Sequence, residues 1–484
     1  MLPRPPVVTI LGHVDHGKTT LLDYIRKSSI ASKEHGGITQ KIGGYEITTD
    51  IKGYKTNKIT FIDTPGHEAF SLLRARGANV ADIALLIIDA KDSLMPQTIE
   101  SISHIKNAKI PFIVVLNKID LPEADPEKVK NDLLKYEIMV EGKGGTTLAL
   151  PVSAKTGKGI HELLEAILLL SSDMNLVYDD TALPQAYIIE TKKDKRGIAT
   201  SIIMRQGRLK LGDVVFAEDK KAKIKAIIND QNQSLEKVFP STPVEILGFT
   251  EIPEVGSIIT TSAKQEKTPE PSQESDIFSS FSVDSILNSD QKKKKLAVII
   301  KADSQGSLEA IDFSLIKNKD IEIILKSIGE INKSDVFLAK TSKAIVIGFN
   351  VKINPEVKQL AKQEKAIIKT YNIIYELIDE LNEVSGLMKE KEEKEKNLKG
   401  EAKVLASFII DQEKVTGAKL IKGKMNLGDE VYIFRANKPI GKTKLVSLQI
   451  RAKKVQEVKK DQECGMVLSP PLDIRVGDVI KSIL

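Results

Sequence analysis

The sequence predicts a multidomain protein of the α/β and β classes. We expect a phosphate-loop (P-loop) domain, a β-barrel, a small α/β domain, a long linking helix and a terminal β-barrel, in that order. The chain has 484 residues, and because one domain holds roughly 100–200 residues, about three or four cores are expected. Short β-branched runs alternate with helical patterns over residues 7–172, and two later segments rich in short strands share one hairpin sequence.

The first domain is predicted over residues 5–172. Apolar, β-branched runs end at polar residues, as in Ile59–Asp63 and Ile83–Asp89, and helical patterns such as Ile160–Leu170 lie between or after the runs. Alternation of this kind produces a mostly parallel sheet that helices cover on both faces.

Residues 183–263 and 401–484 are both predicted to be β-barrels, because short strand runs are separated there by Gly, Asp and Pro. The stretch Gly207–Phe216 (GRLKLGDVVF) matches Gly423–Phe434 (GKMNLGDEVYIF) at the first glycine, at Leu-Gly-Asp and at Val. The match predicts two barrels of one kind. The alternative is shared hairpin chemistry on two different topologies.

Three further segments are predicted between the barrels. Residues 264–295 are Ser-rich and end in lysines, which is typical of a flexible polar linker or insertion. Strand and helix signals over 296–370 predict a small α/β domain. Apolar spacings of three and four then predict a connecting helix over 371–400, about 40 Å long. Its charged half, Lys389–Lys396, favours a solvent-exposed spacer, and a disordered charged linker is the alternative.

Composition excludes several classes of protein. With 41% hydrophobic and 29% charged residues, the chain is not wholly disordered. No apolar run approaches the ~18–20 residues that cross a bilayer, and the N-terminus lacks the pattern of a secretory signal. The single cysteine, Cys464, cannot form an internal disulfide, and no Cys/His cluster has metal-site spacing. We therefore expect a cytoplasmic protein that does not associate with membranes.

The net charge of +6 is concentrated in the last domain. Residues 401–484 hold 16 Lys/Arg and 10 Asp/Glu, so the first 400 residues sum to zero. The surplus indicates either contact with an anion such as a nucleic acid or a solvated surface in a Lys-rich protein, and charge alone does not separate the two.

The P-loop pattern G-x-x-x-x-G-K-[ST] occurs at Gly12–Thr19 (GHVDHGKT), between the first strand and a helical run. Its glycines allow tight turns that point successive N–H groups at phosphate oxygens. Lys18 is expected to reach the β- and γ-phosphates, and the Thr19 hydroxyl to ligate Mg²⁺.

Two more segments are expected at the phosphate end. In Asp63–His67 (DTPGH), Asp63 is expected to hold the metal through water and Gly66 to turn its N–H toward the γ-phosphate. Thr39, in the loop Gly36–Gln40, is placed to reach Mg²⁺ and the γ-phosphate only in the triphosphate state, which predicts a switch loop. Taken alone, each segment could be an ordinary turn.

Two segments predict a guanine pocket, Asn117–Asp120 (NKID) and Ser153–Lys155 (SAK). A carboxylate at Asp120 accepts two hydrogens from a guanine edge, which adenine does not offer, and the Lys118 stem packs on the base. The motifs in this order favour GTP over ATP and make the first domain a P-loop GTPase domain. The candidate nucleotide-binding residues are Gly12, His13, Val14, Asp15, His16, Gly17, Lys18, Thr19, Thr20, Asp63, Thr64, Pro65, Gly66, His67, Asn117, Lys118, Ile119, Asp120, Ser153, Ala154 and Lys155; the candidate Mg²⁺ ligands are Thr19, Thr39 and Asp63.

Together these motifs resemble those of the translational GTPases. The stretch LGHVDHGKTTLLDYIR with GGITQKIGGYE is similar to the bacterial translation initiation factor two family, as are PSTPVEILGF, KADSQGSLEAI, SDVFLAKTSKAIVIGFNV, YNIIYELID and ECG. The resemblance covers nearly all of the chain apart from residues 264–295.

The resemblance implies a monomeric factor that binds GTP, the small ribosomal subunit and formylmethionyl initiator tRNA, promotes subunit joining and then hydrolyses GTP on the ribosome. It implies that His67 orients the attacking water and that Asp15 lies beside the scissile bond. It also implies that Glu463, Cys464 and Gly465 hold the initiator end. No arginine finger, a group worth roughly 10³–10⁵ in rate, is evident in the motifs, so unaided turnover should be slow.

Some features depart from the family pattern and leave alternatives open. This sequence shows no N-terminal extension, and the basic–aromatic–basic run expected after Ser447-Leu448 is altered over Gln449–Ala452. Cys464 could be a buried core thiol. For the whole chain, the alternatives are a related translational GTPase handling a different tRNA or none, and a GTP-dependent scaffold without productive hydrolysis.

Overall fold

The computed structural model describes residues 1–27, 39–40, 42–262, 295–410, 413–436, 438–451 and 453–483. The described residues form two compact units, one that ends at residue 381 and one that begins at residue 382. The predicted linker 264–295 lies outside the described residues except for Lys295.

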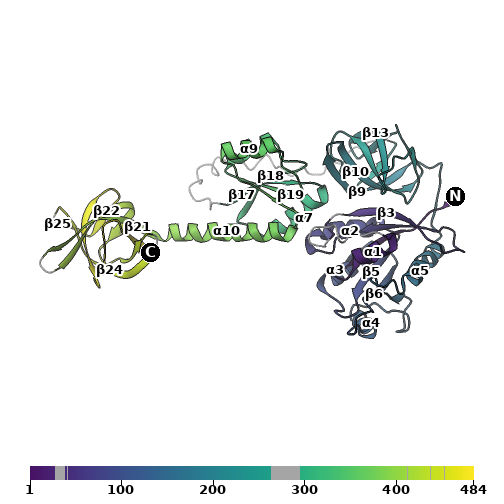
Figure 1. Cartoon of the computed structure of the whole chain (residues 1–484), viewed down its shortest axis with the longest axis horizontal. Coiled ribbons are helices and arrows are strands. Elements are labelled where there is room, and N and C mark those ends of the chain that lie inside the picture. The colour runs from purple at the N-terminus through teal and green to yellow at the C-terminus, as the bar shows by residue number, and fades with distance from the viewer. Residues whose placement is uncertain are drawn as a thin grey trace, which may run out of the picture. The chain divides into compact units, whose positions relative to one another are not determined.

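The first unit begins with an α/β domain (Figure 1). Its sheet has the strand order β3-β4-β2-β5-β6-β7. The strands are β2 (Val7–Gly12), β3 (Gly43–Thr48), β4 (Lys58–Asp63), β5 (Ile83–Asp89), β6 (Phe112–Asn117) and β7 (Ala149–Pro151). All pairs are parallel except β3 with β4. The helices are α1 (Lys18–Arg26), the 3₁₀ turn η2 (Glu68–Phe70), α2 (Ser71–Val80), α3 (Pro96–Ala108), α4 (Pro126–Leu134) and α5 (Ile160–Asp173), and a short pair joins β1 (Leu2–Pro3) to β8 (Val177–Tyr178).

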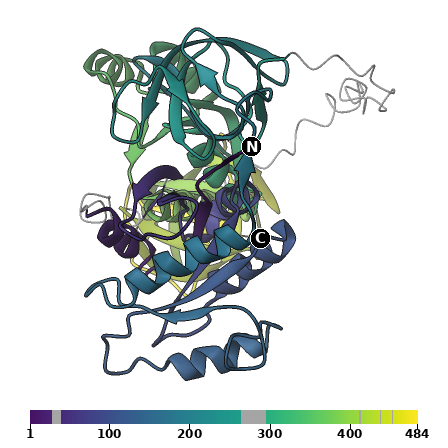
Figure 2. The same cartoon turned by 90° about the vertical axis from the view of Figure 1, so that its right-hand side faces the viewer.

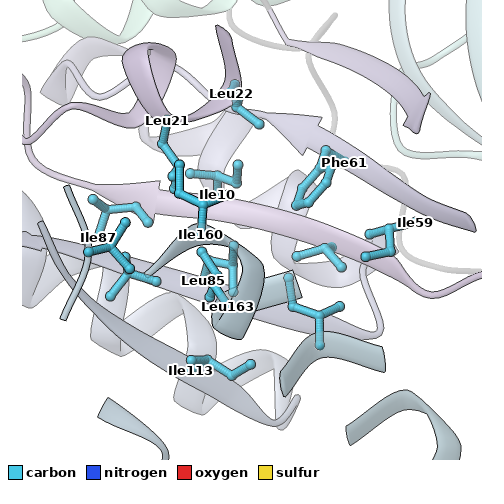
Figure 3. Packing of buried hydrophobic residues seen from close by; sticks show 14 of the residues in the cluster. Ile10, Leu21, Leu22, Ile59, Phe61, Leu85, Ile87, Ile113, Ile160 and Leu163 are labelled. Atoms are coloured by element: carbon cyan, nitrogen blue, oxygen red, sulfur yellow. The ribbon is translucent and has the colours of Figure 1, made fainter. Parts of the chain in front are cut away.

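Both faces of this sheet are buried, which explains why its strands read as continuous apolar runs. On one face, Leu21 of α1 and Leu163 of α5 pack against alternate strand residues such as Leu85 (Figure 3). On the other face, the intervening residues such as Leu86 pack against α3 and α4, for example against Ile102. The arrangement confirms the predicted α/β class for this domain.

A closed barrel follows, with the strand ring β10-β15-β13-β12-β16-β9. Its elements are β9 (Gln185–Asp194), β10 (Gly197–Gln206), β11 (Leu209–Lys210), β12 (Val214–Ala217), β13 (Lys220–Asn229), β14 (Lys237–Val238), β15 (Pro243–Phe249) and β16 (Ile258–Thr260). The barrel lies beside the first sheet (Figure 2), where the Thr60 hydroxyl donates to the Ser241 carbonyl at 2.6 Å.

The small α/β domain has a parallel sheet of order β18-β17-β19-β20. Its elements are β17 (Leu296–Ala302), α7 (Gln305–Leu315), β18 (Ile321–Ile328), α8 (Lys333–Ser342), β19 (Ile345–Phe349), α9 (Pro355–Glu364) and β20 (Ile368–Tyr371). Helix α7 contacts both preceding domains. Glu190 of the barrel accepts the Gly306 N–H at 3.1 Å, and Arg76 of α2 pairs with Glu309 at 3.0 Å.

Helix α10 (Ile374–Lys396) has 23 residues and is about 35 Å long at 1.5 Å per residue. It is shorter at both ends than the predicted span 371–400. Tyr371 instead pairs with Phe349 in β20, and Leu398 pairs with Ile483 in the next sheet. In the described part of the chain, no helix is both long and apolar enough to cross a membrane.

The terminal domain is built from β21 (Leu398–Ile410), β22 (Glu413–Asn426), β23 (Glu430–Arg435), β24 (Lys438–Ile450), β25 (Lys453–Lys454), β26 (Glu457–Lys459), β27 (Glu463–Ser469) and β28 (Val479–Ile483). Its strands pair in the order β22-β27-β24-β23-β28-β21, and β21 pairs again with β22. This ring has the same strand order as the first barrel. The repeat therefore reflects common topology, and the alternative of hairpin chemistry alone is excluded.

The repeated turn works in the same way in both barrels. Asp213 accepts the Lys210 N–H at 2.8 Å, and Asp429 accepts the Asn426 N–H at 2.8 Å. Gly423 has a φ of 66°, and a Cβ there would lie 2.2 Å from the Lys399 carbonyl oxygen. Gly423 lies within β22, three residues before the turn, and a side chain there would displace the neighbouring strand.

Candidate functional site

The P-loop joins the end of β2 to the start of α1 and requires its two glycines. Gly12 has a φ of 144°, and a Cβ there would lie 2.4 Å from the Ile87 carbonyl oxygen. Gly17, with a φ of 85°, has no room for a side chain beside the Asn117 amide. Asp15 also has a positive φ, 63°, which is uncommon for a residue with a side chain. The loop ends at the first turn of α1, whose N–H groups lack partners within the helix and are suited to binding anions.

Lys18 is buried within this loop. Its ammonium donates to the Gly12 carbonyl at 3.0 Å and to the His13 carbonyl. Burial lowers the pKa of Lys18 to about 8, against the opposing effect of the Asp63 carboxylate. The loop is further held by Gln97 of α3, whose side-chain oxygen accepts the Val14 N–H at 2.9 Å. Sequence reasoning missed Gln97, which no local motif marks.

The three candidate metal ligands line one pocket. The hydroxyl oxygens of Thr19 and Thr39 lie 2.7 Å apart, and Asp63 at the end of β4 borders the same space. Within the described ranges, no group of three or more His, Cys, Asp or Glu residues is placed so that it could hold a metal ion. Two hydroxyls and one carboxylate fit Mg²⁺, which prefers oxygen ligands and usually keeps waters and substrate phosphates in its shell.

The two predicted base-pocket segments are joined by Asn117. Its amide donates to the His16 carbonyl at 2.8 Å, and its side-chain oxygen accepts the Ala154 N–H at 3.0 Å. Asn117 therefore ties the P-loop to the segment 153–155. Ile119 is placed by its N–H, which donates to the Val152 carbonyl at 3.4 Å.

Asp120 is oriented by Ser153, whose hydroxyl donates to it at 2.7 Å. That hydrogen bond is the main reason why the pKa of Asp120 lies below its usual value. Lys118 extends back to Asp89 at 2.7 Å and so lies between the base and phosphate ends.

His67 is packed closely against the phosphate end of the site. Its Nδ1 accepts the Ala69 N–H at 2.8 Å, and only 3% of the residue is exposed. Burial, with a smaller effect of the Arg74 guanidinium, lowers the pKa of His67 to about 4, so the ring is neutral at physiological pH. Arg74, fully buried on α2, donates to the Pro65 carbonyl at 3.0 Å and to the His67 carbonyl at 2.5 Å. The sequence did not reveal this role of Arg74.

A pocket of about 260 Å³ brings together many of the predicted residues. It is lined by Val14, Asp15, Gly17, Lys18, Thr19, Thr20, Thr39, Gly66, His67 and Lys118. Thr64 does not line it; its hydroxyl instead donates to the Ile10 carbonyl at 2.6 Å. The predicted phosphate and metal residues therefore converge, and Asn117 links them to the base segments.

The terminal barrel holds a larger pocket, of about 910 Å³. It is lined by Leu405, Ala406, Phe408, Val415, Gly417, Ala418, Gln449, Ile450, Arg451, Asp461, Gln462, Glu463, Cys464 and Gly465. The altered run thus borders the same pocket as the predicted initiator element, apart from Ala452, which lies outside the described residues.

Cys464 belongs to the core of this barrel. It is 5% exposed, its thiol donates to the Ala418 carbonyl at 3.5 Å, and burial raises its pKa to about 11. The neighbouring Glu463 is exposed and Gly465 partly so. The thiol therefore packs as the alternative interpretation expected, and Glu463 and Gly465 are the accessible members of the element.

Models of known protein families match three parts of the chain. Residues 4–172 match the model of the elongation factor Tu GTP binding domain, residues 184–262 that of elongation factor G domain 2, and residues 273–382 that of translation-initiation factor 2.

Curated relatives match nearly the whole of this chain. Translation initiation factor IF-2 of Bartonella bacilliformis is 42% identical, over 99% of this chain and 58% of that protein. The same factor of Syntrophomonas wolfei is 40% identical, over 100% of this chain and 56% of that protein. A crystal structure of GDP-bound aIF5B from Aeropyrum pernix is 26% identical with a TM-score of 0.47, over 99% of this chain and 92% of that one.

The P-loop domain, the guanine-type motifs and the barrel that follows them define the class, the translational GTPases. Within that class, the chain belongs to the translation initiation factor IF-2 family. It spans somewhat under three fifths of the length of the curated relatives it matches.

Proposed function

We propose that the chain binds GTP with Mg²⁺ and hydrolyses it as a translation initiation factor on the ribosome, working as a cytoplasmic monomer. The observation that carries the proposal is the convergence of the P-loop, Thr39 and His67 on one pocket. Asp63 borders the adjoining pocket, which shares Thr19 and Thr39 with the first, and Asn117 ties the P-loop to the segment 153–155 that orients Asp120. The names of the relatives support the initiation step.

At the phosphate end, the P-loop N–H groups and Lys18 would hold the β- and γ-phosphates. Thr19, Thr39 and Asp63 would hold Mg²⁺, which neutralises phosphate charge when bound. Because Thr39 belongs to a loop outside the P-loop, its position would report whether the γ-phosphate is present.

At the base end, Asp120 would accept hydrogens from the guanine edge. The test is Asp120→Asn, which places a donor where guanine also presents donors. GTP affinity should fall by at least tenfold, since unpaired polar groups cost roughly 1–3 kcal/mol each. Xanthosine triphosphate, which carries an acceptor at that position, should bind better than GTP. Unchanged GTP affinity in a nucleotide titration would remove Asp120 from the pocket.

For hydrolysis, we assign His67 to orienting the attacking water, with Asp15 beside the scissile bond. His67→Ala should leave GTP affinity within a few fold and abolish ribosome-stimulated turnover, because water-orienting groups contribute about 10²–10⁴ in rate. Stimulated turnover that survives in this variant would assign the role to another residue, and a wild-type chain that ribosomes do not stimulate would favour a scaffold.

The terminal barrel is proposed to bind the acceptor end of formylmethionyl initiator tRNA. Its surplus of positive charge suits a phosphate backbone, and its pocket combines apolar residues such as Leu405 and Phe408 with polar ones such as Glu463. A free amino group would bring a cation against the apolar side of that pocket, near Leu405 and Phe408, and a cation is costly to desolvate there.

The full chain should therefore bind formylated initiator tRNA more tightly than unformylated tRNA. Affinity should fall with rising salt, with a logarithmic slope of about 0.7–0.9 per phosphate contact. Equal binding of the two forms at several salt concentrations would remove the formyl selectivity. That result would favour a related translational GTPase that handles a different tRNA or none.

A further inference from the structure

The first turn of α10 lies directly against His67. The rings of Tyr375 and His67 have centroids 3.7 Å apart and planes inclined by 46°. Tyr375 itself is 43% exposed, whereas His67 is 3% exposed. One face of the tyrosine ring thus covers the histidine while much of the residue faces solvent, so Tyr375 can be changed with little loss of core.

The start of α10 is also attached to Gln40, the residue after Thr39. The Gln40 amide donates to the Asn372 carbonyl at 2.8 Å, and its side-chain oxygen accepts the Ile374 N–H at 3.2 Å. Gln40 is buried. Both segments expected to sense the γ-phosphate therefore contact one helix end, through Gln40 on one side and His67 on the other.

The hydrogen bonding of His67 shows what this contact does to the ring. Because Nδ1 accepts the Ala69 N–H, the neutral ring carries its proton on Nε2. Nε2 is buried and has no hydrogen-bond partner among the described residues. In this arrangement Nε2 is not accessible to a water molecule, so the His67 ring is held away from the orientation in which it would orient the attacking water.

We propose that Tyr375 is a positioning residue that holds His67 in a resting orientation, and that Gln40 fixes the helix end that carries Tyr375. The inference rests on the proposed function of His67 in hydrolysis. Aromatic ring pairs shift a two-state equilibrium by about two- to tenfold. Tyr375 should therefore lower the unaided hydrolysis rate by this factor, without an effect on nucleotide affinity.

The test is single-turnover GTP hydrolysis by the full chain without ribosomes. Tyr375→Ala should raise the rate about two- to tenfold with unchanged GTP affinity, and Tyr375→Phe, which keeps the ring, should behave as wild type. Gln40→Ala should raise the rate in the same direction. As a control, Phe337→Ala removes an exposed aromatic side chain from α8 of the small α/β domain, and it should leave the hydrolysis rate unchanged.

Two further measurements separate this role from simple packing. In the double variant His67→Ala, Tyr375→Ala the gain in rate should vanish, because it acts through His67. In NMR spectra, the ring protons of His67 should lose their upfield ring-current shift in Tyr375→Ala and keep it in Tyr375→Phe.

An unchanged or lower rate in Tyr375→Ala, with affinity intact, would overturn the inference. A gain that persists in the double variant would do the same. The proposed function fails by a different result, since it requires His67→Ala to abolish ribosome-stimulated hydrolysis in an otherwise wild-type chain.

Discussion

Glu100 offers a test of how the loop that carries His67 is held. This α3 residue pairs with the fully buried guanidinium of Arg74 at 2.6 Å, and Arg74 in turn donates to the carbonyls of Pro65 and His67. His104 lies 3.2 Å from the other carboxylate oxygen of Glu100. Glu100→Ala would leave the Arg74 cation buried without its counter-charge.

The free-energy cost of Glu100→Ala follows from the loss of the ion pair and from the shifted pKa of Glu100. Removing one partner of a buried ion pair costs about 3–5 kcal/mol, and the 29% exposure of the Glu100 side chain argues for the lower end. Burial opposes ionisation of Glu100, but hydrogen bonds from His104, Arg74 and Ser71 outweigh burial and lower its pKa to about 2. Relative to the ordinary value near 4.5, that shift corresponds to at most about 3 kcal/mol at neutral pH. We expect a loss of about 2–3 kcal/mol.

The assay is amide hydrogen exchange of α2 in the full chain, with α5 as the internal reference. Glu100→Ala should raise α2 exchange about 30- to 150-fold, since 1.4 kcal/mol is a factor of ten. Because the folded pKa is depressed, the stabilisation is present above pH 4.5 and is lost as the pH falls toward 2. After correction for intrinsic exchange rates, the protection of the α2 amides in the wild type should fall over this pH range. In Glu100→Ala the protection of these amides should not fall over the same range. Equal exchange in both proteins at neutral pH would refute the reasoning.

Two more outcomes follow from single contacts. Ser153→Ala removes the hydrogen bond that orients Asp120 and should weaken GTP binding about three- to tenfold in a titration, while the exposed Ser103→Ala should not. A Ser153 variant with wild-type affinity would show that Asp120 needs no such support. Cys464 should react with iodoacetamide at pH 8 about 100-fold more slowly in the folded protein than in denaturant, because burial raises its pKa from 9.0 to about 11. Equal rates would place the thiol outside the core.

Local chemistry explains which parts of the site were predictable from the sequence. Gly12, Gly17 and Lys18 lie within one short loop between β2 and α1, where the positive φ of both glycines admits few other residues. The same holds for the repeated hairpin, where a positive φ and an aspartate side chain fix the turn in both barrels. The positive φ angles are local properties of the backbone and therefore appear as glycines in motifs, whereas the close approach of Ile87 and Asn117 to Gly12 and Gly17 comes from distant strands.

Contacts between distant segments could not be predicted in this way. Gln97 holds the P-loop from 83 residues away, and Tyr375 covers His67 from another domain. The helical sequence around Arg74 does not distinguish it from a surface arginine, and only the packing of the structure shows that Arg74 is fully buried. The helix ends were missed for the same reason, since the strand pairing of Tyr371 depends on β19.

In the two barrels the shared sequence specifies the strand topology. The residues that differ between the barrels determine what each barrel contacts. Strands β15 and β27 occupy equivalent places in the two rings. Just before β15, the Ser241 carbonyl accepts a hydrogen bond from Thr60, and Pro243, the first residue of β15, packs closely on Gly44. This edge therefore joins the barrel to the GTPase sheet. Before β27, Asp461 and Gln462 instead line the large pocket. The repeated Leu-Gly-Asp turn therefore predicts the barrel in both places, whereas the residues at this edge decide whether the barrel contacts a neighbouring domain or borders a pocket.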